Sequence, residues 1–206
     1  MSLLTLKNAL ETATQNMPAS TSMCCAKVVS SAQLCALFRE VFLEHEHTLL
    51  RGGAEEPLYT PPSDDAPAII HFREDFVSSA LHEVAHWCIA GAERRKLIDY
   101  GYWYEPDGRS PKQQARFIGV EARPQALEWC FSQAIAVPFR VSMDNLESTT
   151  SAAEVQQFSA AIREEAICIK ANGFPRRARL FFDELTGRFH PDFSLAQLNF
   201  NGLPSS

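Results

Sequence analysis

The segment His82-Glu83-Val84-Ala85-His86 places two histidines four residues apart within a stretch of helical periodicity. Residues i and i+4 lie one above the other on the same face of a helix, so both imidazoles can bind one metal ion. Glu83 is placed to polarise a metal-bound water or to form a hydrogen bond beside the metal. The spacing therefore predicts a metal centre with His82 and His86 as ligands and Glu83 as a catalytic residue.

A centre with two histidines needs a third protein ligand, and it needs open positions for water or oxygen. Glu121 is the first candidate because it leads into a later predicted helix, with the polar Gln125 four residues on. Glu128 is an alternative, because a carboxylate on an apolar helix face is costly to bury unless it is paired or metal-bound. Glu93, shortly after the histidine helix, is a further alternative. The sequence leaves the choice among these three glutamates open.

The identity of the metal is also open from spacing alone. Two histidines and one carboxylate with vacant positions are typical of non-haem Fe(II) oxygenases. The same ligand types bind the catalytic zinc of hydrolases, in which Glu83 would act as general base. Because imidazole and carboxylate suit both metals, we carry two hypotheses: an Fe(II)-dependent hydroxylase and a zinc-dependent hydrolase.

A second group of candidate residues follows the histidine helix and mixes basic, acidic and aromatic side chains. Aromatic rings beside arginines could line a cleft for a cationic alkyl side chain, and aspartates could pair with its ammonium group. The competing interpretation is a strand whose rings, such as that of Tyr100, fill the core. The candidate substrate-binding residues are Arg94, Arg95, Asp99, Tyr100, Tyr102, Tyr104, Asp107 and Arg109.

The spacing of apolar residues predicts an α/β (α+β) fold that is mainly helical with a small sheet. Pro124 suits the first turn of a helix that ends before Pro138, and Gly52-Gly53 predicts a break in regular structure. The expected helices span residues 3–13, 32–44, 75–90, 124–137, 152–171 and 176–185, and the expected extended segments span residues 58–59 and 68–72.

Length and composition suit one domain with a sizeable core. The chain has 206 residues, of which 46% are hydrophobic and 21% are charged, and this excludes wholesale disorder. We expect residues 1–30, rich in Ser, Thr, Ala and Asn, to form a loose arm. Residues 31–206 are then expected to form a single domain.

Charge, cysteines and termini restrict the class of protein. The net charge of −6 disfavours a general nucleic-acid binder. Two segments, residues 94–123 and 170–190, are nevertheless net positive and would face an acidic partner. Six cysteines without a CxxC pair favour reduced thiols in the cytoplasm. We expect neither a signal peptide nor a membrane-spanning helix, because no long apolar run is present.

Several longer motifs occur in order along the chain. They are Glu56–Tyr59 (EPLY), Ser79–Gly91 (SALHEVAHWCIAG), Arg94-Arg95, Asp99–Tyr104 (DYGYWY), Pro106–Arg109 (PDGR), Pro124–Trp129 (PQALEW) and Ser142–Glu147 (SMDNLE). Together these motifs resemble the elongation factor P hydroxylase family. The resemblance covers roughly residues 33–190, and residues 1–30 have no counterpart in it.

The resemblance implies a bacterial cytoplasmic enzyme that hydroxylates elongation factor P, an acidic, tRNA-shaped translation factor. The substrate lysine in that family already carries a β-lysyl group. The resemblance further implies O₂ as oxidant, a centre of two histidines and one carboxylate, and a fold similar to a metal-dependent ribonuclease family. Hydroxylation of an unactivated C–H bond needs an oxidant that no side chain supplies, which favours Fe(II), although zinc could occupy the site in a crystal. We expect no nucleic-acid or membrane partner.

Overall fold

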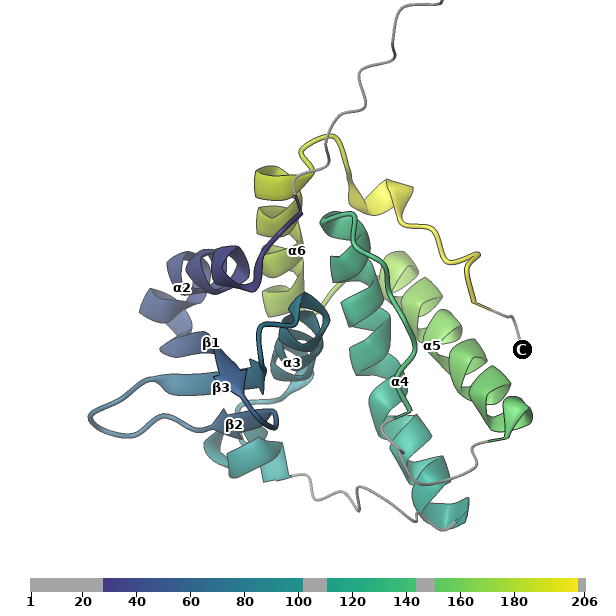
Figure 1. Ribbon diagram of the computed structural model, residues 1–206, viewed down its shortest axis with the longest axis horizontal. Coiled ribbons are helices and arrows are strands. Elements are labelled where there is room, and N and C mark those ends of the chain that lie inside the picture. Colours follow the sequence, from purple (N-terminus) through teal and green to yellow (C-terminus); the bar gives the residue numbers. More distant parts are fainter. Residues whose placement is uncertain (1–27, 102–110, 144–150, 204–206) are drawn as a thin grey trace, which may run out of the picture.

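The structure, a computed structural model, describes residues 28–101, 111–143 and 151–203, which form helices around a small sheet (Figure 1). The side chains of Pro111, Lys112, Gln114 and Ala115 are outside this description. The helices are α2 (Ser31–Glu46), α3 (Val77–Ile89), α4 (Pro111–Ala134), α5 (Ala152–Asn172) and α6 (Arg176–Phe189), and the short 3-10 turns are η1 (Arg94–Lys96), η2 (Ile98–Gly101) and η3 (Leu195–Gln197).

The sheet has three strands in the order β1-β3-β2, and it supports the start of the histidine helix. The strand β1 (Thr48–Ala54) runs parallel to β3 (Ala68–Arg73), and β2 (Leu58–Thr60) pairs with β3 in the antiparallel sense. Alternate residues of β3 are buried, which gives the sheet one face against the core. A short turn after β3 then leads directly into α3.

The break expected at Gly52-Gly53 is wrong, because both glycines lie within β1. A Cβ on Gly52 would lie 2.7 Å from the ring of Phe72, so only glycine lets the strand pass that ring. Gly53 has φ +87° and the pairing register shifts at this point, as in a bulge. The glycines therefore shape the strand instead of ending it.

Helix α3 lies in the middle of the fold and contacts β3, α4 and α6 (Figure 1). Its apolar side chains form a buried stripe that includes Leu81, Val84 and Ala85. Trp87 is fully buried against α2, with ring centroids 5.1 Å from Phe38 and 4.8 Å from Phe42. This packing fixes the rotation of α3 about its axis, so the opposite face, which carries the two histidines, is held in one direction.

Helix α4 differs from the expectation, because Pro124 lies in its interior and not in its first turn. A proline in the interior of a helix lowers the stability of that helix by about 3 kcal/mol. Tertiary packing outweighs that cost: Phe117, before the proline, is buried and its ring centroid lies 5.9 Å from that of Phe158 on α5. The helix ends at Ala134, and Ala136 adopts a left-handed conformation with φ 56°.

The prediction of a mainly helical protein with a small sheet is confirmed, and the helices predicted at 32–44, 152–171 and 176–185 are present with small shifts at their ends. The expected helix at 3–13 and most of the expected arm at 1–30 lie outside the described residues. The single domain at 31–206 and the similarity to a ribonuclease-like fold stay predictions.

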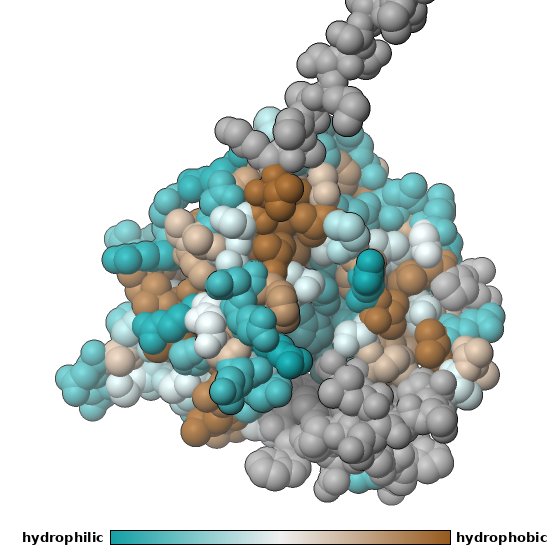
Figure 2. All heavy atoms as spheres, in the orientation of Figure 1, coloured by the Kyte–Doolittle hydropathy of each residue, from teal (hydrophilic) through white to brown (hydrophobic). Residues whose placement is uncertain are grey.

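No helix in the described parts is long and apolar enough to cross a membrane. Figure 2 shows hydrophobic residues in separate patches between hydrophilic areas on one face.

The contact around Gly52 generates a test of the sheet. We expect Gly52→Ala to lower the free energy of unfolding by about 1–3 kcal/mol, because the new methyl group would press on Phe72 and on the Glu74 carbonyl. Gly187→Ala is the matched control, since Gly187 lies in α6 with open space around it and alanine favours helix. Chemical denaturation measures both, and equal stability of the two variants would contradict the assignment.

Candidate metal centre

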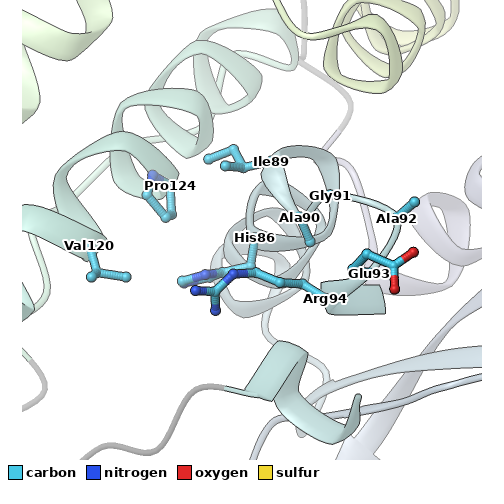
Figure 3. A pocket seen from close by; sticks show the side chains of 9 residues that line it. All are labelled: His86, Ile89, Ala90, Gly91, Ala92, Glu93, Arg94, Val120 and Pro124. Atoms are coloured by element: carbon cyan, nitrogen blue, oxygen red, sulfur yellow. The ribbon is translucent and has the colours of Figure 1, made fainter. Parts of the chain in front are cut away.

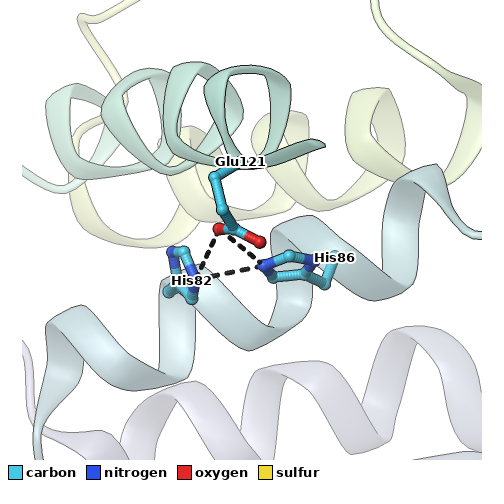
Figure 4. A group of neighbouring side chains, drawn as sticks. All are labelled: His82, His86 and Glu121. Carbon is cyan, nitrogen blue, oxygen red and sulfur yellow. Dashed lines mark hydrogen bonds and ion pairs between the residues drawn. The ribbon is translucent and has the colours of Figure 1, made fainter. Parts of the chain in front are cut away.

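Three side chains from two helices converge on one point (Figure 4). His82 Nε2 lies 3.1 Å from His86 Nε2 and 3.5 Å from Glu121 Oε2, and His86 Nε2 lies 3.2 Å from the same oxygen. Two ligands about 2.1 Å from one ion lie roughly 3.0 Å apart at a right angle and about 3.4 Å apart at the tetrahedral angle. The three donor atoms therefore have the separations that a single shared cation requires.

The convergence follows from the helix geometry. His82 and His86 are one turn apart on the face of α3 that packs against α4. Glu121 and Glu128 are two turns apart on α4, and both are buried, with 2% and 6% of their surface exposed. A buried carboxylate is costly unless it has a charged or hydrogen-bonding partner. The imidazoles of α3 are the partners of both.

The two glutamates contact different nitrogens of His82. Glu121 faces Nε2, whereas Glu128 Oε2 lies 2.9 Å from Nδ1. An ionised carboxylate can only accept, so Nδ1–H must be the donor, and this leaves Nε2 available to bind a metal. Glu93 does not reach the site: its side chain is 84% exposed and pairs with Lys96. Of the three candidates, only Glu121 offers an oxygen to both histidines.

The same contacts change the protonation of His82. Burial alone would lower its pKa, but the hydrogen bond to Glu128 and the charges of Glu128, Glu121 and Glu83 raise the pKa to about 10. In the metal-free protein His82 is therefore an imidazolium near neutral pH. A metal ion must displace this proton before it can bind Nε2.

Glu83, on α3, interacts electrostatically with Asp99 and Tyr100 of η2. Burial raises the pKa of its carboxyl, partly offset by the neighbouring His82 and His86, while Glu121 and Asp99 raise it further. A carboxyl with a raised pKa beside a metal centre can hold a proton at a pH where an exposed glutamate cannot. This property fits the role predicted for Glu83.

Asp99 and Tyr100 join the site region to the sheet. Asp99 Oδ1 accepts the backbone N–H of Tyr59 at 2.8 Å, and the Tyr59 and Tyr100 rings stack at 4.3 Å. The Tyr59 hydroxyl donates to the Arg95 carbonyl. Tyr100 is buried, as the core interpretation expected, but it lies in the 3-10 turn η2 and not in a strand.

A cavity of about 420 Å³ opens beside His86, between the C-terminal end of α3 and α4 (Figure 3). Figure 3 shows the Arg94 side chain directed to the His86 side of the cavity, whereas the carboxylate of Glu93 lies at the opposite side. Arg95 contacts the Ala90 carbonyl and does not line the cavity. The lining residues are His86, Ile89, Ala90, Gly91, Ala92, Glu93, Arg94, Val120 and Pro124. Four other predicted substrate-binding residues, Tyr102, Tyr104, Asp107 and Arg109, lie outside the described residues.

Arg177, at the start of α6, contacts the end of α3 and was not predicted from the sequence. Its Nη2 donates to the carbonyls of Trp87, Cys88 and Ala90, and its guanidinium lies 4.7 Å from the centre of the Trp87 ring. A cation at a helix C-terminus stabilises the helix through its unpaired carbonyls. With about ninety residues between Arg177 and α3, no local sequence pattern reveals this contact.

Gln125 also has a structural role that the sequence did not reveal. Its amide bonds both the N–H and the carbonyl of Ser142, at 3.1 Å and 2.6 Å. It therefore holds the chain that follows α4 and does not face the histidines.

The geometry predicts different metal contents for three glutamine variants. We expect Glu121→Gln to abolish stable metal binding, because the ligand charge is lost. Glu128→Gln should weaken binding about 10- to 100-fold, as loss of an orienting hydrogen bond does. Glu93→Gln is the control and should retain wild-type affinity. Metal titration of purified protein measures all three, and loss of binding in Glu93→Gln alone would contradict the site.

The raised pKa of His82 predicts that metal affinity depends on pH. Because one proton must leave, we expect the affinity for Co²⁺ to rise about tenfold per pH unit between pH 6.5 and 8.5, below the pKa of about 10. Glu128→Gln removes the largest contribution that raises this pKa, so its dependence should be shallower. Competition with a chelator measures both slopes, and a pH-independent wild-type affinity would rule out the displaced proton.

Comparison with known proteins identifies the family of this chain. The sequence matches the family described as elongation factor P hydroxylase over residues 37–200, which include the three converging residues. A protein of Haemophilus influenzae named elongation factor P lysine hydroxylase is 41% identical over 169 residues, 81% of this chain and 94% of the relative. The match extends over most of both chains. The chain therefore belongs to the elongation factor P hydroxylase family.

Proposed function

We propose that this protein hydroxylates a lysine of elongation factor P, and that the lysine carries a β-lysyl group before the reaction. The convergence of His82, His86 and Glu121 beside a cavity is the observation that carries the proposal. Membership of the family supports the reaction type and the protein substrate. The name of the Haemophilus influenzae relative supports a lysine as the residue modified.

We further propose Fe(II) as the metal, held by His82 Nε2, His86 Nε2 and Glu121. The donor set fits, because two imidazoles and one carboxylate on one side leave coordination positions for other molecules. Bound Fe(II) would supply the activation of O₂ that inserts one oxygen atom into a C–H bond. Zinc suits the same donors and would occupy the site without supplying that redox chemistry.

The protein's own residues then have distinct tasks. Glu128 fixes the His82 tautomer through Nδ1–H, and Glu83, whose carboxyl pKa is raised by burial, can take up and release a proton next to the histidines. The apolar wall of the cavity, formed by residues such as Ile89 and Val120, excludes water from the alkyl chain of the substrate. Glu128 thus positions His82, Glu83 exchanges a proton, and the cavity wall removes water from the substrate.

Residues around the cavity are proposed to bind the substrate. Arg94 lines the cavity, while Arg95, Asp99 and Tyr100 hold the turns beside it. The net-positive segments 94–123 and 170–190 would face an acidic protein. We place the enzyme in the cytoplasm with elongation factor P, and the roles of Tyr102, Tyr104, Asp107 and Arg109 stay predictions.

The proposal predicts the mass change of the substrate. Incubation of the Fe(II)-loaded protein with β-lysylated elongation factor P in air, with a reductant, should add one oxygen atom to the modified lysine. His86→Ala should abolish the reaction while the protein stays folded, because it removes one metal ligand. Intact mass spectrometry and circular dichroism measure these two results.

Glu44→Gln, at an exposed glutamate of α2 that does not line the cavity, serves as the control for the mass measurement and should retain the reaction. A zinc-dependent hydrolase with Glu83 as general base would instead release a fragment of the substrate. Loss of mass, or wild-type turnover by His86→Ala, would refute the proposed function.

A further inference from the structure

Pro124 leaves one backbone carbonyl of α4 without its usual donor. Proline has no N–H, so the carbonyl of Val120, four residues earlier, cannot receive the i+4 helical hydrogen bond. No backbone N–H outside α4 in the described parts donates to this carbonyl. Val120 and Pro124 both line the cavity beside His86 (Figure 3). A carbonyl without its usual i+4 donor therefore belongs to a residue of the cavity wall.

The position of this carbonyl determines which part of a ligand it could contact. Val120 directly precedes Glu121, whose carboxylate faces both histidines. A donor bound to the Val120 carbonyl would lie on the same turn of α4 as Glu121, beside the cavity that His86 also lines. Ile89, Ala90 and the Pro124 ring make the neighbouring wall apolar, which suits an alkyl chain on one side of such a donor.

At the His86 end of the cavity the charges favour a neutral donor over an ammonium group, whereas the Glu93 carboxylate lies at the opposite side. Figure 3 shows the Arg94 guanidinium on the same side of the cavity as His86, and a bound metal ion would add further positive charge there. An ammonium group at this end would meet like charges. A neutral amide N–H carries no such cost, and leaving the carbonyl unpaired in a dry cavity is itself unfavourable.

We infer that the Val120 carbonyl, made available by Pro124, accepts the amide N–H of an acylated lysine and so distinguishes it from free lysine. The inference rests on the proposed function and assigns the specificity to one backbone acceptor. It also gives Pro124 a role that the packing of Phe117 against Phe158 does not supply.

The test uses Pro124→Ala in the full chain, loaded with zinc so that binding is measured without oxidation. Alanine restores the N–H, which then competes for the Val120 carbonyl. We expect a higher unfolding temperature, unchanged zinc affinity and a Kd for β-lysylated elongation factor P that is about 2- to 10-fold weaker, as loss of one hydrogen bond produces. Pro62→Ala, at an exposed proline between β2 and β3, is the matched control and should bind as the wild type does.

A second ligand removes the donor instead of the acceptor. Semi-synthetic elongation factor P carrying an ester in place of the lysine amide keeps the shape and lacks the N–H. The wild type should bind this ester about 2- to 10-fold more weakly than the amide. Pro124→Ala should bind the two equally, because its carbonyl already has a partner. This comparison separates the hydrogen bond from any effect of the lost proline ring.

Three results overturn the inference: equal binding of amide and ester by the wild type, an equal preference for the amide in both proteins, or loss of zinc by Pro124→Ala. The first two leave the proposed function intact if the Fe(II)-loaded wild type still oxidises the amide substrate. Failure of the wild type to bind or oxidise that substrate refutes the proposed function itself.

Discussion

Two buried carboxylates on α4 face two imidazoles on α3, and this pairing determines much of the rest of the structure. Glu121 and Glu128 are almost fully buried, and neither could be stable there without a charged partner. Each one contacts a different nitrogen of His82, and Glu121 reaches His86 as well. The two helices must therefore lie in one register, because a rotation of either helix would leave a buried carboxylate unpaired.

The surrounding elements hold α3 in that register. Trp87 packs between aromatic rings of α2, and Arg177 reaches from α6 to the last carbonyls of α3. Glu46, at the end of α2, lies near the guanidinium groups of Arg95 and Arg177 at 3.8 and 3.9 Å and also pairs with Arg176. The site thus rests on helices fixed at their ends by charged contacts and in the middle by the core.

The sequence was most informative where a residue's role depends on local geometry. The i, i+4 spacing of His82 and His86 predicts their common face without knowledge of any other element. The third ligand could not be chosen, because Glu121 and Glu128 share one face of α4. Only the tertiary contacts show that Glu121 reaches both histidines and Glu128 reaches Nδ1 of His82. The start of α4 was predicted wrongly at Pro124. The helix extends N-terminal to this proline, where Phe117 packs against Phe158 of α5, and such a tertiary contact is not visible in the local sequence. The break expected at Gly52 was wrong for the same kind of reason. Position 52 requires glycine because Phe72 on the neighbouring strand leaves no room for a Cβ.

The position of a bound metal tests the central claim most directly. An anomalous-difference map of crystals loaded anaerobically with Fe(II), recorded at the iron absorption edge, would locate the ion. We expect one peak about 2.0–2.2 Å from His82 Nε2, His86 Nε2 and a carboxylate oxygen of Glu121, with Glu128 still bonded to Nδ1 of His82. A peak bound by Glu128, or crystals with full iron content and no peak between these two helices, would contradict the account.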